Sequence, residues 1–142
     1  MTAKEYLGQT YRIDQRINSK LEQIASLREL SSKATNTLTD IPRNPSRDIH
    51  PMESIIAKMI DLENEINNDI DTLVDLKREI VTIIKVIENP EYQTLLELRY
   101  LCFKSWEQIA VDMGYELRYL HKLHGRALKT CESILKEDTK RH

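Results

Sequence analysis

Glycine and proline are scarce in this chain, whose 142 residues include only 3 Gly and 4 Pro. Aromatic residues are also few, at 6% of the composition. A fold of short strands joined by tight turns needs more of all three, so this class of fold is excluded. Long stretches without any helix-breaking residue favour helices instead. We therefore predict an all-α fold.

Long apolar runs are absent as well. No segment reaches the roughly 18 apolar residues that a membrane-spanning helix needs, and the residues that follow Met1 are polar rather than an apolar signal core. We therefore expect a cytoplasmic protein that has no membrane partner.

Cysteine is rare too, and the two that occur, Cys102 and Cys131, lie in helical patterns without the close spacing of a disulfide framework. We expect buried, reduced thiols. His121 and His124 suggest zinc, but ten residues of helix separate His121 from Cys131, roughly 15 Å. The sequence contains no catalytic triad, phosphate-binding glycine loop or HExxH motif. We expect neither an enzyme nor a bound metal or cofactor.

The net charge of −2 is too near zero to indicate a nucleic-acid-binding protein by itself. Its distribution is more informative. Residues 99–142 contain nine Lys/Arg and six Asp/Glu, so they carry +3 and residues 1–98 carry −5. Three of the four His also lie in this last segment. The C-terminal third is therefore mildly basic and the rest of the chain is acidic.

The first part of the chain has the apolar spacing of an amphipathic helix. The apolar positions are Leu7, Tyr11, Ile13, Ile17, Leu21, Ile24, Leu27 and Leu30. They predict one long helix over residues 3–36. Residues 37–51 hold three of the four prolines, and proline interrupts helices. We therefore expect a loop there.

A second long helix is predicted by alternating spacings of three and four, which are typical of a coiled-coil seam. The seam positions are Met52, Ile55, Met59, Leu62, Ile66, Asp69, Leu73, Leu76, Ile80, Ile83 and Ile87. A second apolar stripe consists of Ile56, Ile60, Ile70, Val74, Val81 and Ile84. Because this face is wider than one seam requires, the helix should contact more than one neighbour.

Two arrangements satisfy that wide face. The two long helices can fold into an antiparallel hairpin, or copies of the chain can pair through residues 52–87. We expect both, with a dimer as the favoured homo-oligomer. Asp69 interrupts the seam; it either fixes the register through a partner on the other helix or lies at an exposed end.

Asn89 and Pro90 should separate two domains, because a residue before proline disfavours the helical conformation and proline suits the first turn of a new helix. We predict a helical arm over residues 1–88 and a head over residues 90–142. The head should contain helices at residues 90–101, 105–113 and 117–135.

The head has the residue spacing of a helix-turn-helix motif. The small Ala110 lets two helices cross closely, and Gly114 supplies the positive φ of a sharp turn. Ser105 is a natural N-cap, with Gln108 at the capping-box position. The expected core of the motif is Trp106, Ile109, Ala110, Met113, Gly114, Leu120 and Leu123.

In such a motif the second helix enters the major groove of DNA. The residues free to face bases are then Leu117, Arg118, His121 and Lys122, with Arg118 suited to a bidentate contact with guanine. Phosphates would be held by Arg126, Lys104 and the amide end of the helix that starts at Ser105. The alternative is a solvated basic helix face. Glu116 opposes DNA binding, because an acid there more often repels phosphate than reads cytosine.

Several blocks resemble a family of small proteins of Gram-positive phages and prophages. They include Ala3-Lys4-Glu5-Tyr6-Leu7, Ile13-Asp14-Gln15-Arg16-Ile17-Asn18, Leu62-Glu63-Asn64-Glu65-Ile66-Asn67, Asp75-Leu76-Lys77-Arg78-Glu79-Ile80, Leu95-Leu96-Glu97-Leu98-Arg99-Tyr100-Leu101 and Leu123-His124-Gly125-Arg126-Ala127-Leu128. The head is similar to region four of bacterial sigma factors and to phage transcriptional regulators of the RinA and ArpU type. This chain has Phe103 where that family usually has glycine, and Glu116 where a serine caps the recognition helix.

The resemblance implies binding to double-stranded promoter DNA, with a possible contact to RNA polymerase. Our leading hypothesis is a dimeric phage-type transcriptional regulator whose two heads engage a promoter. One alternative is a protein-interaction module that binds RNA polymerase or another regulator. Another is a DNA-packaging recognition subunit, which works in rings.

Overall fold

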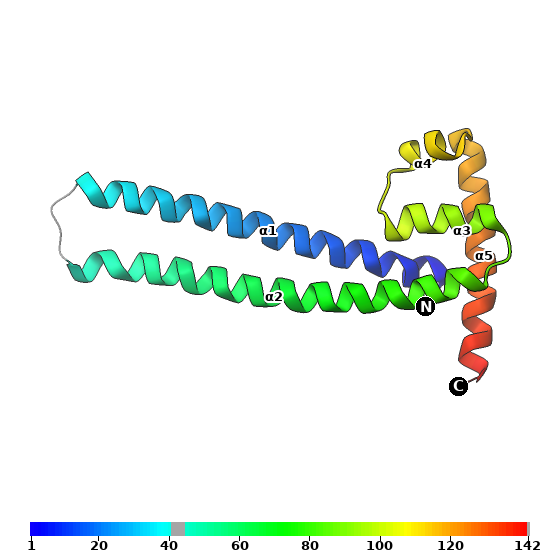
Figure 1. Cartoon of the computed structure of the whole chain (residues 1–142), viewed down its shortest axis with the longest axis horizontal. Coiled ribbons are helices and arrows are strands. Elements are labelled where there is room, and N and C mark those ends of the chain that lie inside the picture. The colour runs from blue at the N-terminus through cyan, green and yellow to red at the C-terminus, as the bar shows by residue number, and fades with distance from the viewer. Residues whose placement is uncertain (41–44, 142) are drawn as a thin grey trace. The chain divides into compact units, whose positions relative to one another are not determined.

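The computed structural model describes the backbone of residues 1–40 and 45–141, and the side chains of residues 1–33 and 52–138. Every regular element in these ranges is a helix (Figure 1), so the predicted all-α fold class is confirmed. Within the described residues, no helix is long and apolar enough to cross a membrane.

The first two helices are longer than the sequence predicts. Helix α1 is Ala3–Asp40 and helix α2 is Pro45–Val86. The predicted loop over residues 37–51 is therefore wrong for residues 37–40 and 45–51; its remaining part, 41–44, lies outside the described residues. Pro45 occupies the first position of α2, where its missing N–H has no acceptor within the helix. Pro51 lies about two turns into α2. Because proline has no backbone N–H, one helical hydrogen bond is missing there, but the helix continues.

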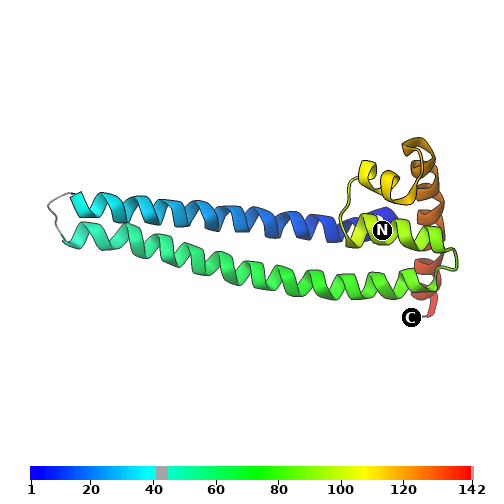
Figure 2. The ribbon, with the colours of Figure 1, turned by 45° about the horizontal axis from the view of Figure 1, so that its top comes forward.

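The chain divides into two compact units, and unit 2 is Asp14–Thr72. In this unit α1 and α2 run side by side in opposite directions (Figures 1 and 2). Ile17, Ile24, Leu62 and Ile66 are buried between them. Asp69, which interrupts this apolar seam, accepts a hydrogen bond from Lys20 Nζ at 2.6 Å and lies 3.6 Å from Arg16. Of the two interpretations of Asp69, the cross-helix partner is the observed one.

The second apolar stripe of α2 remains exposed in unit 2. Ile56 is 48% exposed, Ile60 is 51% exposed and Ile70 is 41% exposed. These residues repeat at intervals of four and fourteen, which return to the same face of a helix. The intramolecular pairing of α1 with α2 therefore leaves part of the expected apolar face uncovered.

Unit 1 consists of Met1–Ile13 and Leu73–His142. The boundary between the units therefore lies inside the two long helices. The reason is a shared core, in which the first turns of α1 and the last turns of α2 pack against the C-terminal helices. Its buried residues are Ala3, Leu7, Leu76, Ile80, Ile84, Ile87, Leu96, Tyr100, Ala127 and Cys131. The division at Asn89 into an arm and a head stays a prediction.

Buried polar groups tie this core together. The hydroxyl of Thr10, which is fully buried, lies 2.8 Å from the backbone oxygens of both Leu7 and Tyr100 and shares its one proton between them. Lys77 Nζ donates to the carbonyl of Leu101 at 3.1 Å. A buried hydroxyl without a hydrogen-bond partner would destabilise the fold. The Thr10 contacts therefore hold the start of α1 against the backbone at Tyr100.

The C-terminal helices are α3 (Pro90–Leu96), η1 (Glu97–Leu101), α4 (Trp106–Met113) and α5 (Leu117–Arg141). Asn89 caps α3 through its side chain, and Pro90 follows at the first position, as the sequence predicts. The segment expected to be one helix over residues 90–101 changes to a π-helical turn at Glu97. The last helix extends beyond the expected residue 135.

The cysteines are both free, but only Cys131 is buried, so the expectation of two buried thiols is wrong for Cys102. Cys102 directly follows the π-helical turn and is exposed. Burial raises the pKa of the Cys131 thiol to about 11, which keeps it protonated and unreactive at neutral pH.

Candidate nucleic-acid interface

Helices α4 and α5 are joined by the short segment Gly114-Tyr115-Glu116. Ser105 is the N-cap of α4, and its hydroxyl accepts a hydrogen bond from the Gln108 N–H at 3.2 Å. The Gln108 side chain donates instead to Asp112 at 2.8 Å, so the expected reciprocal half of a capping box is absent between these described residues. Gly114 ends α4 with φ 73°, a left-handed conformation that glycine adopts without strain.

A separate small core holds α4 against α5. Its buried residues are Leu95, Ile109, Leu120 and Leu123. Trp106, Ala110 and Met113 pack against this core and are partly exposed. The residues that the sequence assigns to the motif core therefore lie together, with Gly114 at the turn. Because opposite sides of a helix cannot both face the core, their burial determines which side of α5 faces solvent.

Four basic residues follow the solvent-facing side of the first half of α5. Arg118, Lys122, Arg126 and Lys129 are spaced by three or four residues, so they are neighbours on the helix surface, and all are exposed. No acidic residue occurs in the sequence between Leu117 and Cys131. None of the four basic side chains makes an ion pair with a described residue. We call these four residues the basic face.

Gly125 lies in the middle of the basic face. A Cβ atom built at this position would meet nothing within 4 Å, so packing within the chain does not require a glycine. Glycine in a helix interior costs about 0.8–1.0 kcal/mol relative to alanine. Arg118 is also in the first turn of α5, where a positive charge opposes the helix dipole by about 0.3–1 kcal/mol. This face therefore carries features that disfavour folding.

The aromatic rings of Trp106, His121 and His124 pack together next to the basic face. The Trp106 ring lies 4.9 Å from the ring of His121 and 4.5 Å from that of His124. Arg99 stacks on Trp106 at 4.6 Å, and its NH1 donates to the carbonyl of Lys104. His121 remains exposed beside the basic face, so it can still reach a ligand.

His124 has a structural role instead. It is buried, and its Nε2 lies 2.7 Å from the hydroxyl of Tyr100. Burial, and after it the nearby charges of Lys4, Arg99 and His121, lower the pKa of His124 to about 4. Burial likewise raises the pKa of Tyr100 to about 12. The pair is therefore neutral at pH 7, and it joins η1 to α5 without adding charge to the core.

Two of the expected phosphate contacts have partners within the chain. Lys104 Nζ lies 2.7 Å from a carboxylate oxygen of Asp112, and this hydrogen bond raises the Lys104 pKa and lowers the Asp112 pKa. The Ser105 hydroxyl is the cap of α4. The geometry therefore disfavours Lys104 as a phosphate contact, because Asp112 already neutralises its charge. Leu117, Arg118, His121, Lys122 and Arg126 are exposed on α5, where the sequence predicts the contact surface.

Glu116 immediately precedes the basic face. Its carbonyl accepts the first helical hydrogen bond, from Leu120 N–H at 2.9 Å, so it occupies the N-cap position of α5. Its side chain is exposed. A carboxylate near the helix N-terminus favours folding, but at this position it also reduces the positive potential of the basic face.

Sequence reasoning missed Lys129, Gly125 and the structural role of His124. The spacing signals were present: Lys129 is seven residues after Lys122, and His124 lies four residues after Leu120 on the buried side. Arg99 was counted only as a charge, because its stacking on Trp106 depends on the π-helical turn. Among the described residues, no three His, Cys, Asp or Glu side chains gather as metal ligands would.

Comparison with known proteins identifies no relative. No protein-family model matches the chain, and neither a curated protein nor a solved structure matches it.

Proposed function

We propose that the chain is a DNA-binding protein that places the first half of α5 in the major groove, and that it regulates transcription from promoter DNA. The basic face is the observation that carries this proposal: four exposed cations on one helix, directly after a sharp turn and without an acidic partner among the described residues. Phosphates supply the missing negative charge.

The cost of this face to folding supports a ligand rather than solvation. Alanine would fit the space at Gly125 and form a helix more readily. The same holds for Gly8, but only Gly125 lies among the four cations of the basic face. A glycine at this position allows a phosphate backbone to approach the helix closely. Arg118 at the helix start is likewise explained by a bidentate contact to guanine, which is worth about 1–3 kcal/mol of discrimination between bases.

The exposed stripe of α2 in unit 2 supports a dimer. Ile56, Ile60 and Ile70 are each more than 40% exposed on one helix face, and a second copy of the same helix can bury them in a symmetric interface. Dimerisation would also strengthen the electrostatic attraction to DNA, which is weak for a single basic face. One basic face offers about four phosphate contacts, which give a slope of about −3.6 for log K against log salt concentration. Two linked faces double that dependence.

The direct test is a fluorescence-anisotropy titration of promoter-length duplex DNA at several salt concentrations. We expect wild type to bind at low salt and to lose about a hundredfold in affinity per basic face between 50 and 200 mM salt. Arg118→Ala/Lys122→Ala should remove most of this binding. Lys58→Ala/Lys85→Ala removes the same charge from two exposed lysines of α2 and should bind like wild type.

Two outcomes would overturn the proposal. One is no binding by wild type at low salt, which would favour a protein-interaction module. The other is an equal loss in both double variants, which would indicate unspecific charge attraction. The molar mass of the free protein, measured by light scattering, separates a dimer from the ring expected for a DNA-packaging subunit.

A further inference from the structure

A second surface of unit 1 lies at the other end of α5 and has the opposite charge. A hollow of about 450 Å³ is lined by residues of α1, α2 and α5. A neighbouring hollow of about 400 Å³ shares Val86, Ile134 and Glu137 with it. Because they share these three residues, the two hollows lie next to each other, and we call them together the acidic groove.

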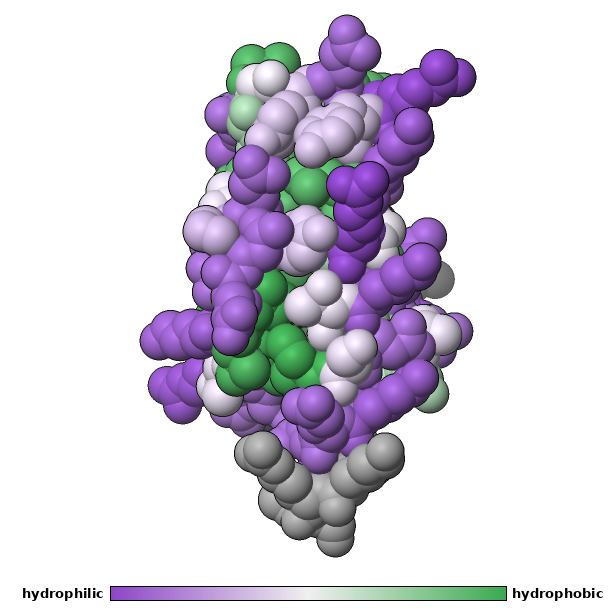
Figure 3. Space-filling model, turned by 90° about the vertical axis from the view of Figure 1, so that its right-hand side faces the viewer, coloured by the Kyte–Doolittle hydropathy of each residue, from purple (hydrophilic) through white to green (hydrophobic). Residues whose placement is uncertain are grey.

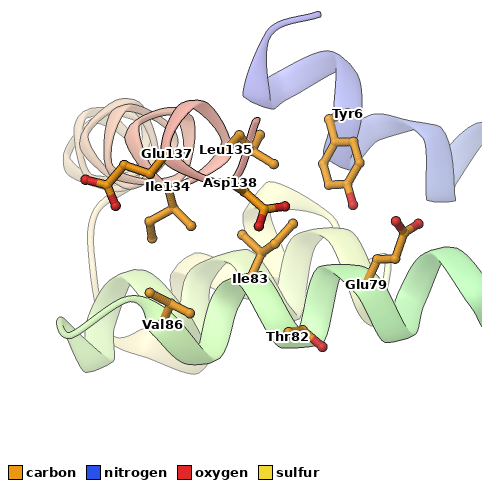
Figure 4. Close-up of a pocket in the computed structure, with 9 residues that line it drawn as sticks. All are labelled: Tyr6, Glu79, Thr82, Ile83, Val86, Ile134, Leu135, Glu137 and Asp138. Carbon is orange, nitrogen blue, oxygen red and sulfur yellow. The ribbon is translucent and has the colours of Figure 1, made fainter. Parts of the chain in front are cut away.

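The floor of the acidic groove is apolar. Ile83, Ile134 and Leu135 are partly buried and pack on the large core of unit 1, and Val86 is 60% exposed. Figure 4 shows Ile83 and Ile134 in the space between α2 and α5. Figure 3, which views this side of the molecule, shows apolar side chains gathered between hydrophilic ones. An exposed apolar floor next to a folded core favours an apolar ligand.

The edges of the groove are acidic. Glu79 and Glu137 lie at opposite ends of the first hollow, with Asp138 between them (Figure 4), and Glu88 lines the second hollow. Among residues 1–33 and 52–138, whose side chains the structure describes, no lysine, arginine or histidine lines either hollow. None of these acids forms an ion pair with a described residue. Tyr6 lines the first hollow beside these acids. Burial raises its pKa to about 12, and the negative charge of Glu79 is the next largest cause of the increase.

We infer that the acidic groove binds a basic amphipathic helix of a partner protein. The apolar floor accepts aliphatic side chains spaced by three or four residues, and the carboxylates pair with lysine or arginine on either side of them. Residues of α2 and α5 line both hollows. DNA is excluded as the occupant, because the acidic edges repel phosphate. The basic face and the groove occupy successive parts of α5: Lys129 is the last residue of the face, and Thr130 is the first residue of α5 that lines the groove. Arg118 and Ile134 are sixteen residues apart, about 24 Å along the helix.

The experiment uses the full chain and a labelled synthetic helical peptide of leucine and lysine, patterned as an amphipathic helix. A peptide with glutamate in place of lysine is its control. We expect wild type to bind the lysine peptide, more weakly at higher salt, and not to bind the glutamate peptide. Glu137→Lys/Asp138→Lys should weaken binding at least tenfold. Val86→Ser should weaken it at least threefold, and because Val86 is largely exposed, this variant should fold normally.

Glu22→Lys/Asp75→Lys is the matched control, since both residues are exposed on α1 and α2 and neither lines the groove. It should bind within twofold of wild type, and circular dichroism should show equal helix content in all variants. Failure of wild type to bind the lysine peptide would overturn the inference. So would equal weakening in both charge-reversal variants, or unchanged binding by Val86→Ser. None of these outcomes depends on DNA binding.

Discussion

Replacing Gly125 with alanine should make the protein more stable and less able to bind DNA. Gly125 lies inside α5 and an added Cβ meets nothing within 4 Å, so the substitution gains helix propensity without creating a clash. The gain should be about 0.5–1 kcal/mol in the free energy of unfolding. If the basic face contacts a phosphate backbone, the added methyl group should displace it and weaken binding about fivefold, or on the order of 1 kcal/mol.

Gly8 offers a matched control. It also lies inside a long helix, and a Cβ atom there also meets nothing within 4 Å. Urea denaturation at one fixed protein concentration should show a similar gain for Gly8→Ala and Gly125→Ala, whereas anisotropy should show weaker DNA binding only for Gly125→Ala. A loss of stability in Gly125→Ala would refute the structural reasoning. Unchanged DNA binding would show that Gly125 is not at the interface.

Three further predictions concern single residues. The folded-state pKa of His124 is depressed from 6.5 to about 4, so its contribution to stability is present above pH 6.5 and is lost as the pH falls toward 4, by about 3 kcal/mol in total. Urea midpoints measured from pH 7 to pH 4 should therefore fall less steeply for His124→Gln than for wild type; equal slopes would contradict this. Phe103 has φ 58°, while its ring contacts Tyr11 and Lys77. Phe103→Gly should thus be about 1 kcal/mol more stable than Phe103→Ala, and a more stable alanine variant would rule out backbone strain. Glu116→Ser should raise stability by about 0.5 kcal/mol through a better N-cap and tighten DNA binding by removing a negative charge. Anisotropy showing weaker binding would mean that Glu116 contacts DNA directly.

Apolar periodicity was sufficient to predict the helices. The spacing of residues 3–36 and 52–87 located α1 and α2, and Asn89-Pro90 located the start of α3. The proline rule predicted too long a loop over residues 37–51, because Pro45 suits the first position of α2 and the helix continues through Pro51 with one backbone hydrogen bond fewer. Local rules also located the turn at Gly114, since its left-handed backbone depends on one residue.

Contacts between distant segments were not predictable. The seam pattern assigned Ile83 to the core and Ile84 to the second stripe, but Ile84 is the more buried, because the core of unit 1 receives residues from α1 and α5 as well. The pairing of Lys104 with Asp112 depends on how the segment after η1 meets α4. The candidate site was thus predictable where it follows one helix face, as for Arg118 and Lys122.

Selection of DNA from a random duplex pool tests the central claim most directly. We predict that wild type enriches a sequence containing guanine at a defined position, and that Arg118→Ala loses the preference at that position while Lys122→Ala weakens binding to all sequences alike. Failure of wild type to enrich any sequence at low salt would contradict the assignment of α5 as a reader of DNA.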